Sequence, residues 1–278
     1  MSSRAIKAVV RLELAEVLRS RWLAFTLVVY VLLASAFILV GLRESTVVGF
    51  TGTGRVLLSF SHALVLLLPL LALSATAQVI NGARASGSLE LILSQPISRQ
   101  DYFIAVALVR YLVLVIPLAV VTLGIAVFAN LALGQNIPWG YLGRALAVGT
   151  TLLSAFVGLG LLVTTIAQSQ AKAAIAVLVL WLGSVALLDF ALVGAMLEWR
   201  VPPRVVFAMA AVNPVEAARL ALIGSADPEL GVLGPVGFYL ATHLGQTGLM
   251  VLGLGWPVLV GLGAGGLAGL LFRRGDVV

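Results

Sequence analysis

Long apolar runs dominate the chain, and six of them approach the roughly 20 residues that a helix needs to cross a hydrocarbon core. The cleanest run, 22–42, contains no charged residue and is flanked by arginines. The other runs are 56–79, 103–128, 142–167, 173–197 and 249–272. The pattern predicts six transmembrane helices, which place both termini on the same side of the membrane.

Residues 1–21 follow a different pattern. Apolar residues recur at helical spacings of three and four, namely Ile6, Val10, Leu14 and Val17. Basic residues mark another face of the same helix: Arg4, Lys7 and Arg11. Because no short apolar stretch is followed by a small-residue cleavage site, we expect an amphipathic interface helix rather than a signal peptide. Its basic face is either a simple membrane anchor or a surface for a cytoplasmic partner.

The segment 198–248, between the last two runs, is too long and too apolar for a plain loop. A helix is predicted to begin at Asn213-Pro214 and to carry Glu216 and Arg219, because Asn-Pro is a typical start signal. We expect one or two short helices here that lie in the outer interface or dip partly into the bilayer.

The composition agrees with a membrane protein. Of the 278 residues, 61% are hydrophobic and 10% are charged, with a mean hydropathy of +1.14. Soluble domains have about 25% charged residues, so a soluble enzyme, a disordered tail and a nucleic-acid-binding module are excluded. The predicted fold class is therefore an all-α integral membrane protein.

The charges indicate an orientation. If the N-terminus is cytoplasmic, eleven of the 17 Lys and Arg residues fall on the inner side, and basic loops favour the cytoplasm. We therefore expect a multi-pass protein of the cell membrane with both termini in the cytoplasm. Arg110 and Arg144 lie near the ends of runs, and we expect them to extend to the membrane interface.

The residues that carry chemistry are few. The chain has no Cys, two His (His62 and His243) and four Met, so we expect no metal site. No Gly-x4-Gly-Lys-Ser/Thr phosphate loop is present, so we expect neither ATP hydrolysis nor a cofactor in this chain. The glycines of the last run, Gly261, Gly263, Gly265 and Gly266, are expected to allow close helix packing.

Asp189 is the one acid deep in a predicted span. An intramembrane carboxylate either fixes helix packing through hydrogen bonds or contacts a substrate or proton. The second reading keeps open an alternative function, a secondary proton-coupled transporter that uses Asp189.

The stretch between the second and third predicted spans, 80–102, is predicted to contain a short helix of about two turns bracketed by Gly87 and Pro96. This stretch resembles the signature of ABC-2 type transporter permeases, in which Gly-Thr-Leu-Glu-Leu-Leu-Leu-Ser-x-Pro-x-Ser-Arg follows an acidic-Arg-acidic run. The matching residues are Arg84, Gly87, Leu89, Glu90, Leu91, Leu93, Ser94, Pro96, Ser98 and Arg99, with Ser88 in the Thr place. The likeness extends to the leading helix, the six spans and Asn213-Pro214, and so covers nearly the whole chain.

The resemblance implies a permease with a type V exporter-like architecture, built as a homodimer along spans one, two and five. A separate ATPase subunit, in two copies, would bind ATP and Mg. The coupling contact to that ATPase would be made by Arg84, Gly87, Leu89, Glu90, Leu93, Pro96 and Arg99, together with the leading helix. Energy from ATP would drive export or mechanical transmission across the membrane.

Within this family, the chain most resembles permeases of the copper-linked transporters that support nitrous oxide reductase maturation. Gly49-Phe50-Thr51, Asp189 and the segment from Asn213-Pro214 to Arg219-Leu220 carry that likeness. Ala83 and Ala85 replace the flanking acids, and Ala105-Val106 replaces the expected Gly-Lys, which removes charges at the implied ATPase interface. Any copper role is expected to be indirect, through an extracytoplasmic accessory protein.

Overall fold

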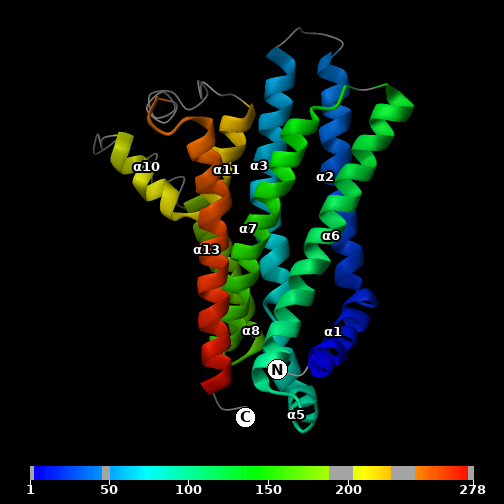
Figure 1. The fold of residues 1–278 in the computed structure, drawn as a ribbon, viewed down its shortest axis with the longest axis vertical. Helices are drawn as coiled ribbons and strands as arrows, with labels where there is room; N and C mark the ends of the chain where they lie inside the picture. The colour runs from blue at the N-terminus through cyan, green and yellow to red at the C-terminus, as the bar shows by residue number, and fades with distance from the viewer. Residues whose placement is uncertain (1–2, 46–50, 135, 188–202, 227–241, 275–278) are drawn as a thin grey trace.

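The computed structural model describes residues 3–45, 51–134, 136–187, 203–226 and 242–274 (Figure 1). Every regular element among these residues is a helix, which confirms an all-α protein for the described part of the chain. The helices are α1 (Ser3–Leu18), α2 (Arg21–Ser45), α3 (Thr51–Thr76), α4 (Val79–Ala85), α5 (Ser88–Leu93), α6 (Arg99–Leu133), α7 (Trp139–Ile166), α8 (Gln170–Leu182), the π-helical segment η1 (Gly183–Leu187), α10 (Pro203–Val212), α11 (Pro214–Ala226) and α13 (Gly245–Arg274).

Five helical stretches are long and apolar enough to cross a membrane: Phe60–Ala85, Arg99–Ala132, Trp139–Ile166, Gln170–Leu187 and Gly245–Arg274. A sixth candidate is the pair Ile6–Leu18 and Arg21–Ala36, which is bent by 69°. The described residues therefore contain five or six candidate spans. The bend turns α1 away from the direction of α2, so that α1 lies across one end of the bundle.

The long helices run side by side along the long axis, with α7 at the centre in contact with α3, α6, α8, α11 and α13 (Figure 1). Helix α1 begins, and α13 ends, at the end of the bundle that carries α5. Helices α10 and α11 lie toward the opposite end. This arrangement separates two polar regions, one at the α5 end and one around α11.

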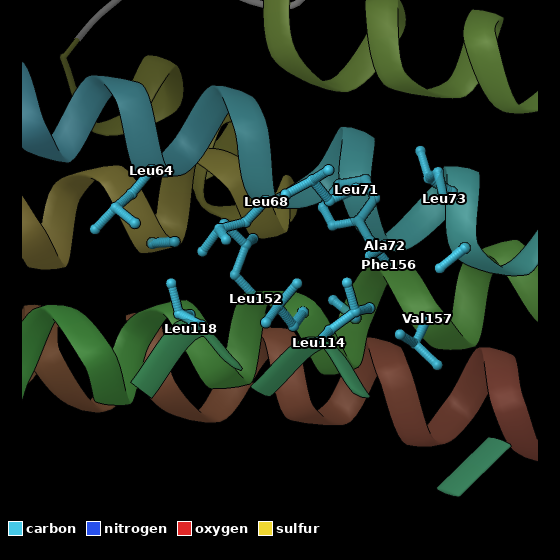
Figure 2. Packing of buried hydrophobic residues seen from close by; sticks show 14 of the residues in the cluster. Leu64, Leu68, Leu71, Ala72, Leu73, Leu114, Leu118, Leu152, Phe156 and Val157 are labelled. Atoms are coloured by element: carbon cyan, nitrogen blue, oxygen red, sulfur yellow. The ribbon is translucent and has the colours of Figure 1, made fainter. Parts of the chain in front are cut away.

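The apolar core lies where α3, α6 and α7 meet. Side chains from the three helices interdigitate there and are almost fully buried (Figure 2). They include Leu64, Leu68, Leu71, Leu73, Leu114, Leu118, Leu152 and Phe156. Burial of these aliphatic side chains fixes how the three helices pack at the centre of the bundle.

Glycines bring α7 and α13 into backbone contact. A Cβ added at Gly158 would lie 2.3 Å from the Gly261 carbonyl oxygen, and one at Gly261 would lie 2.5 Å from the Ser154 carbonyl oxygen. The prediction of close packing is therefore confirmed at Gly261. A Cβ added at Gly265 would make an ordinary 3.8 Å contact with the Gly158 Cα. The prediction does not hold for Gly263 and Gly266, where an added Cβ would meet nothing within 4 Å among the described residues.

Candidate functional site

The short helices α4 and α5 form an elbow (residues 79–98) at one end of the bundle. Gly87 joins them with φ of +70°, a left-handed conformation that glycine adopts without a Cβ penalty. The Gly87 N–H donates to the Arg84 carbonyl at 3.1 Å, and the Ser86 and Ser88 hydroxyls lie 2.9 Å apart. The backbone conformation thus explains why the sequence motif has a glycine here, because the chain must turn sharply between the two helices.

The leucines of α5 lie on different faces of the helix, one buried and one exposed. Leu89 is fully buried in the core, whereas Leu91 is 72% exposed. Leu93 is half-buried, and Glu90 and Pro96 are exposed. The sequence had singled out Leu89 and Leu93, but the exposed apolar side chain is that of Leu91. Helical geometry could have found it, since residues two apart do not share a face.

The elbow is connected to several long helices. The Ser98 hydroxyl caps α6 by accepting the Asp101 N–H at 3.0 Å. Arg99 Nη1 donates to the Arg273 carbonyl at 3.5 Å and so joins the start of α6 to the end of α13. The Asn81 N–H donates to Thr164 Oγ1 of α7 at 3.4 Å. Arg84 is half-buried, and its Nε has no hydrogen-bond partner in the described part of the chain.

Helix α1 presents its basic residues outward. Lys7 and Arg11 are exposed, while the side chain of Arg4 lies outside the described residues. The buried stripe is Val9, Glu13 and Val17, and Leu14 of the predicted apolar face is 38% exposed. The buried face of α1 is therefore rotated from the predicted one and includes an acid.

Glu13 forms an ion pair with α6, in which its Oε2 lies 3.1 Å from Arg110 Nη2. The two side chains are only 5% and 14% exposed. Burial raises the pKa of the Glu13 carboxyl, and the Arg110 guanidinium beside it opposes that rise. The charge of Arg110 is thus matched by a partner on α1.

A cavity of about 570 Å³ lies between α1, the elbow and α6. Its walls carry both polar and apolar groups, among them Glu13, Glu16, Gln78, Ser86, Ser88, Tyr102 and Arg110. The cavity makes α1 and the elbow, which are distant in sequence, parts of one continuous site.

Around α11, buried polar groups form a second cluster, which we call the α11 polar belt. Asn213 is 5% exposed and caps α11, with its Oδ1 accepting the Val215 N–H at 3.0 Å. Its Nδ2 donates to the Ser184 carbonyl of the π-helical segment at 2.6 Å. Pro214 occupies the first helical position, where its missing N–H costs nothing. Asn213 therefore joins the start of α11 to η1.

The α11 polar belt continues along the helix. Glu216 Oε1 lies 2.8 Å from Arg219 Nη1, and both side chains are largely buried. The Arg144 guanidinium donates to the Ser225 hydroxyl, so Arg144, like Arg110, has a partner inside the bundle. The hydroxyls of Ser61 and Tyr141 form a hydrogen bond that joins α3 to α7, and Tyr141 is close to Arg144 in the sequence of α7. Helix α11 thus packs among α3, α7 and α13, and ten of its thirteen residues are buried.

In the described part of the chain, neither histidine belongs to a cluster of metal ligands. His62 and His243 are both exposed, the first on α3 and the second just before α13. Among the described residues, no group of three or more His, Asp or Glu side chains could hold a metal ion. Asp189 lies outside the described residues.

This arrangement, a bundle of candidate membrane-spanning helices with a short elbow helix at one end, is that of a multi-pass membrane protein. Residues 7–276 match the family model described as "ABC-2 family transporter protein", and the chain belongs to that family.

Two relatives are both described as "Probable ABC transporter permease protein NosY". The one from Pseudomonas aeruginosa is 28% identical over 225 residues, which cover 79% of this chain and 82% of the relative. The one from Stutzerimonas stutzeri is 25% identical over 218 residues, which cover 76% and 79%. The chain is thus an ABC-2 type permease subunit of an ABC transporter and is similar to NosY.

Proposed function

We propose that this chain is the membrane subunit of an ATP-driven transporter, in which a separate ATPase subunit acts on the elbow and on α1. Two copies of the chain meet along α2, α3 and α8 and bind two ATPase subunits, with both termini in the cytoplasm. ATP and Mg are bound by the ATPase. ATP hydrolysis drives the export of a lipid-like, peptide or small hydrophobic molecule, or a movement that is transmitted to an extracytoplasmic accessory protein.

The observation that carries this proposal is the placement of α5. The helix lies at one end of the bundle with Leu91 exposed, and its buried Leu89 anchors it to the core. A force on α5 reaches α6 through the Ser98 cap and α13 through the contact between Arg99 and Arg273. The exposed leucine suits a hydrophobic contact at the centre of a protein interface.

The test is purification of the tagged chain from its own host in mild detergent, with Leu91→Ser compared with wild type. We expect a stoichiometric subunit with a phosphate loop to co-purify with wild type and to be largely lost from Leu91→Ser. Leu244→Ser is the control, because Leu244 is 37% exposed and precedes α13 at the opposite end of the bundle. Absence of any ATPase, or equal recovery with Leu91→Ser, would contradict the proposal.

We extend the proposal to an indirect role in maturation of the copper sites of nitrous oxide reductase, which the sequence resemblance at Gly49-Phe50-Thr51 and from Asn213-Pro214 to Arg219-Leu220 implies. The chain supplies no thiolate, and its two histidines lie on separate elements, so the accessory protein would handle the metal. Copper titration of the purified chain should leave its thermal unfolding unchanged. Metal-dependent stabilisation would overturn this role.

A further inference from the structure

A second cavity, of about 610 Å³, lies between α6, α7 and α13. We call it the α6–α13 groove. Large apolar side chains at its edges are exposed, with Leu108 at 44%, Leu262 at 70% and Leu270 at 52%. The groove therefore opens on the outer surface of the bundle, where a membrane helix meets lipid.

The middle of the groove offers an occupant almost no hydrogen bonds. Its lining there is aliphatic, aromatic or glycine, apart from two hydroxyls. The Tyr111 hydroxyl donates to the Thr150 carbonyl at 3.3 Å, and the Ser154 hydroxyl donates to the Thr151 carbonyl at 2.6 Å. Because both donors are satisfied within the protein, the groove suits a hydrocarbon chain.

One end of the groove is cationic. Arg273 lines it, and Arg99 lies beside Arg273, since the Arg99 guanidinium donates to the Arg273 carbonyl. Arg274 adds a further positive charge. In the sequences of α6 and α13 the only acid is Asp101, which is 5% exposed. The charge at this end complements an anionic headgroup.

The length of the groove also fits one membrane leaflet. Its lining along α13 runs from Val258 to Arg273. At 1.5 Å per residue this is about 22 Å, close to half the thickness of a bilayer with its headgroup regions. The apolar length and the basic end are therefore spaced as the acyl chain and phosphate of one phospholipid are.

We propose that the α6–α13 groove binds one anionic phospholipid from the leaflet on the elbow side as a resident lipid. An acyl chain lies along α13 over Gly266, and the phosphate contacts Arg273. The site is formed by helices other than the proposed dimer helices, and it does not depend on the ATPase.

The test is native mass spectrometry of the detergent-purified full chain, titrated with phosphatidylglycerol and with phosphatidylcholine of identical acyl chains. Gly266→Leu should fill the groove, because an added Cβ there meets open space, and should weaken both lipids by about tenfold. Gly263→Leu is the matched control, since Gly263 also faces open space but does not line the groove. It should bind lipid as wild type does.

The headgroup is tested separately. Wild type should prefer phosphatidylglycerol, and Arg273→Gln should reduce that preference by about fivefold, whereas Arg274→Gln should reduce it less. If Gly266→Leu does not fold, Ala107→Leu narrows the groove from α6 and should give the same loss. Equal lipid binding by Gly266→Leu and Gly263→Leu, or no headgroup preference, would overturn the proposal. So would a change in dimerisation with lipid binding retained, which would make the groove a protein interface.

Discussion

Glu13 of α1 and Arg110 of α6 lie 97 positions apart in sequence and form a buried ion pair with 3.1 Å between their charged atoms. The pair attaches α1 to the same helix that the elbow enters through the Ser98 cap. Both segments proposed to contact the ATPase are therefore fastened to α6, so a displacement of either one is passed to that helix.

Removing one partner of this pair should be costly. Glu13→Gln leaves the Arg110 charge largely buried and unmatched, and we expect a loss of about 3 kcal/mol in the free energy of unfolding. Thermal unfolding in detergent measures it. Glu16→Gln is the control, because Glu16 is an exposed acid on the same helix. Replacing both partners by leucine should recover much of the loss, and equal stability of the Glu13 and Glu16 variants would contradict the role of the pair.

The turn between α4 and α5 should depend on glycine. Gly87→Ala places a Cβ in a left-handed conformation and should cost about 1 kcal/mol, with a weaker ATPase contact because α5 is reoriented. Stability and co-purification of the ATPase are the two measurements. Gly82→Ala is the comparison, since its Cβ would make an ordinary 3.7 Å contact with Gln170. A Gly87→Ala protein with wild-type stability and ATPase recovery would show that the turn does not need glycine.

The contact between α7 and α13 should tolerate no side chain. Gly158→Ala and Gly261→Ala each push a Cβ into backbone atoms of the other helix, and we expect a loss of about 2 kcal/mol for each. Gly263→Ala lies in the same helix as Gly261 but faces open space, and should change stability by less than about 0.5 kcal/mol. Similar unfolding temperatures for all three variants would mean that the two helices can separate without cost.

Asn213 makes two hydrogen bonds that substitutions can separate. Asn213→Ala removes both the cap of α11 and the bond to the Ser184 carbonyl, and should cost about 2 kcal/mol. Asn213→Asp keeps an oxygen for the cap but has no Nδ2 donor for Ser184. Hydrogen exchange of α11 should therefore increase strongly in Asn213→Ala, while Asn213→Asp should retain more protection at Val215. Equal protection in the two variants would contradict the capping role.

Local pattern predicted the helices well but the side-chain roles less well. The apolar runs located the long helices, and Gly87 and Pro96 correctly bracketed a short one. The prediction singled out Leu89, which is buried, and passed over Leu91, which is exposed, although helical geometry places the two leucines on different faces. The face of α1 was also misjudged, since an acid such as Glu13 is normally assigned to the surface when its buried partner is unknown.

The partners of the two arginines near the ends of the apolar runs also could not be predicted from local pattern. Arg110 and Arg144 were expected to extend to the interface because they lie near the ends of apolar runs. Their partners, Glu13 and Ser225, come from α1 and α11, which are distant in the chain. No local signal predicts such a contact.

The apolar runs alone establish that this protein is helical and spans a membrane, because only lipid can solvate so much apolar surface and only closed backbone hydrogen bonding is stable there. Its motif also indicated the ABC-2 family. Tertiary structure alone decided that α11 packs inside the bundle, which glycine of α13 contacts α7, and which charges are matched. These properties depend on the packing of helices that are far apart in the chain, and local periodicity carries no information about distance between helices.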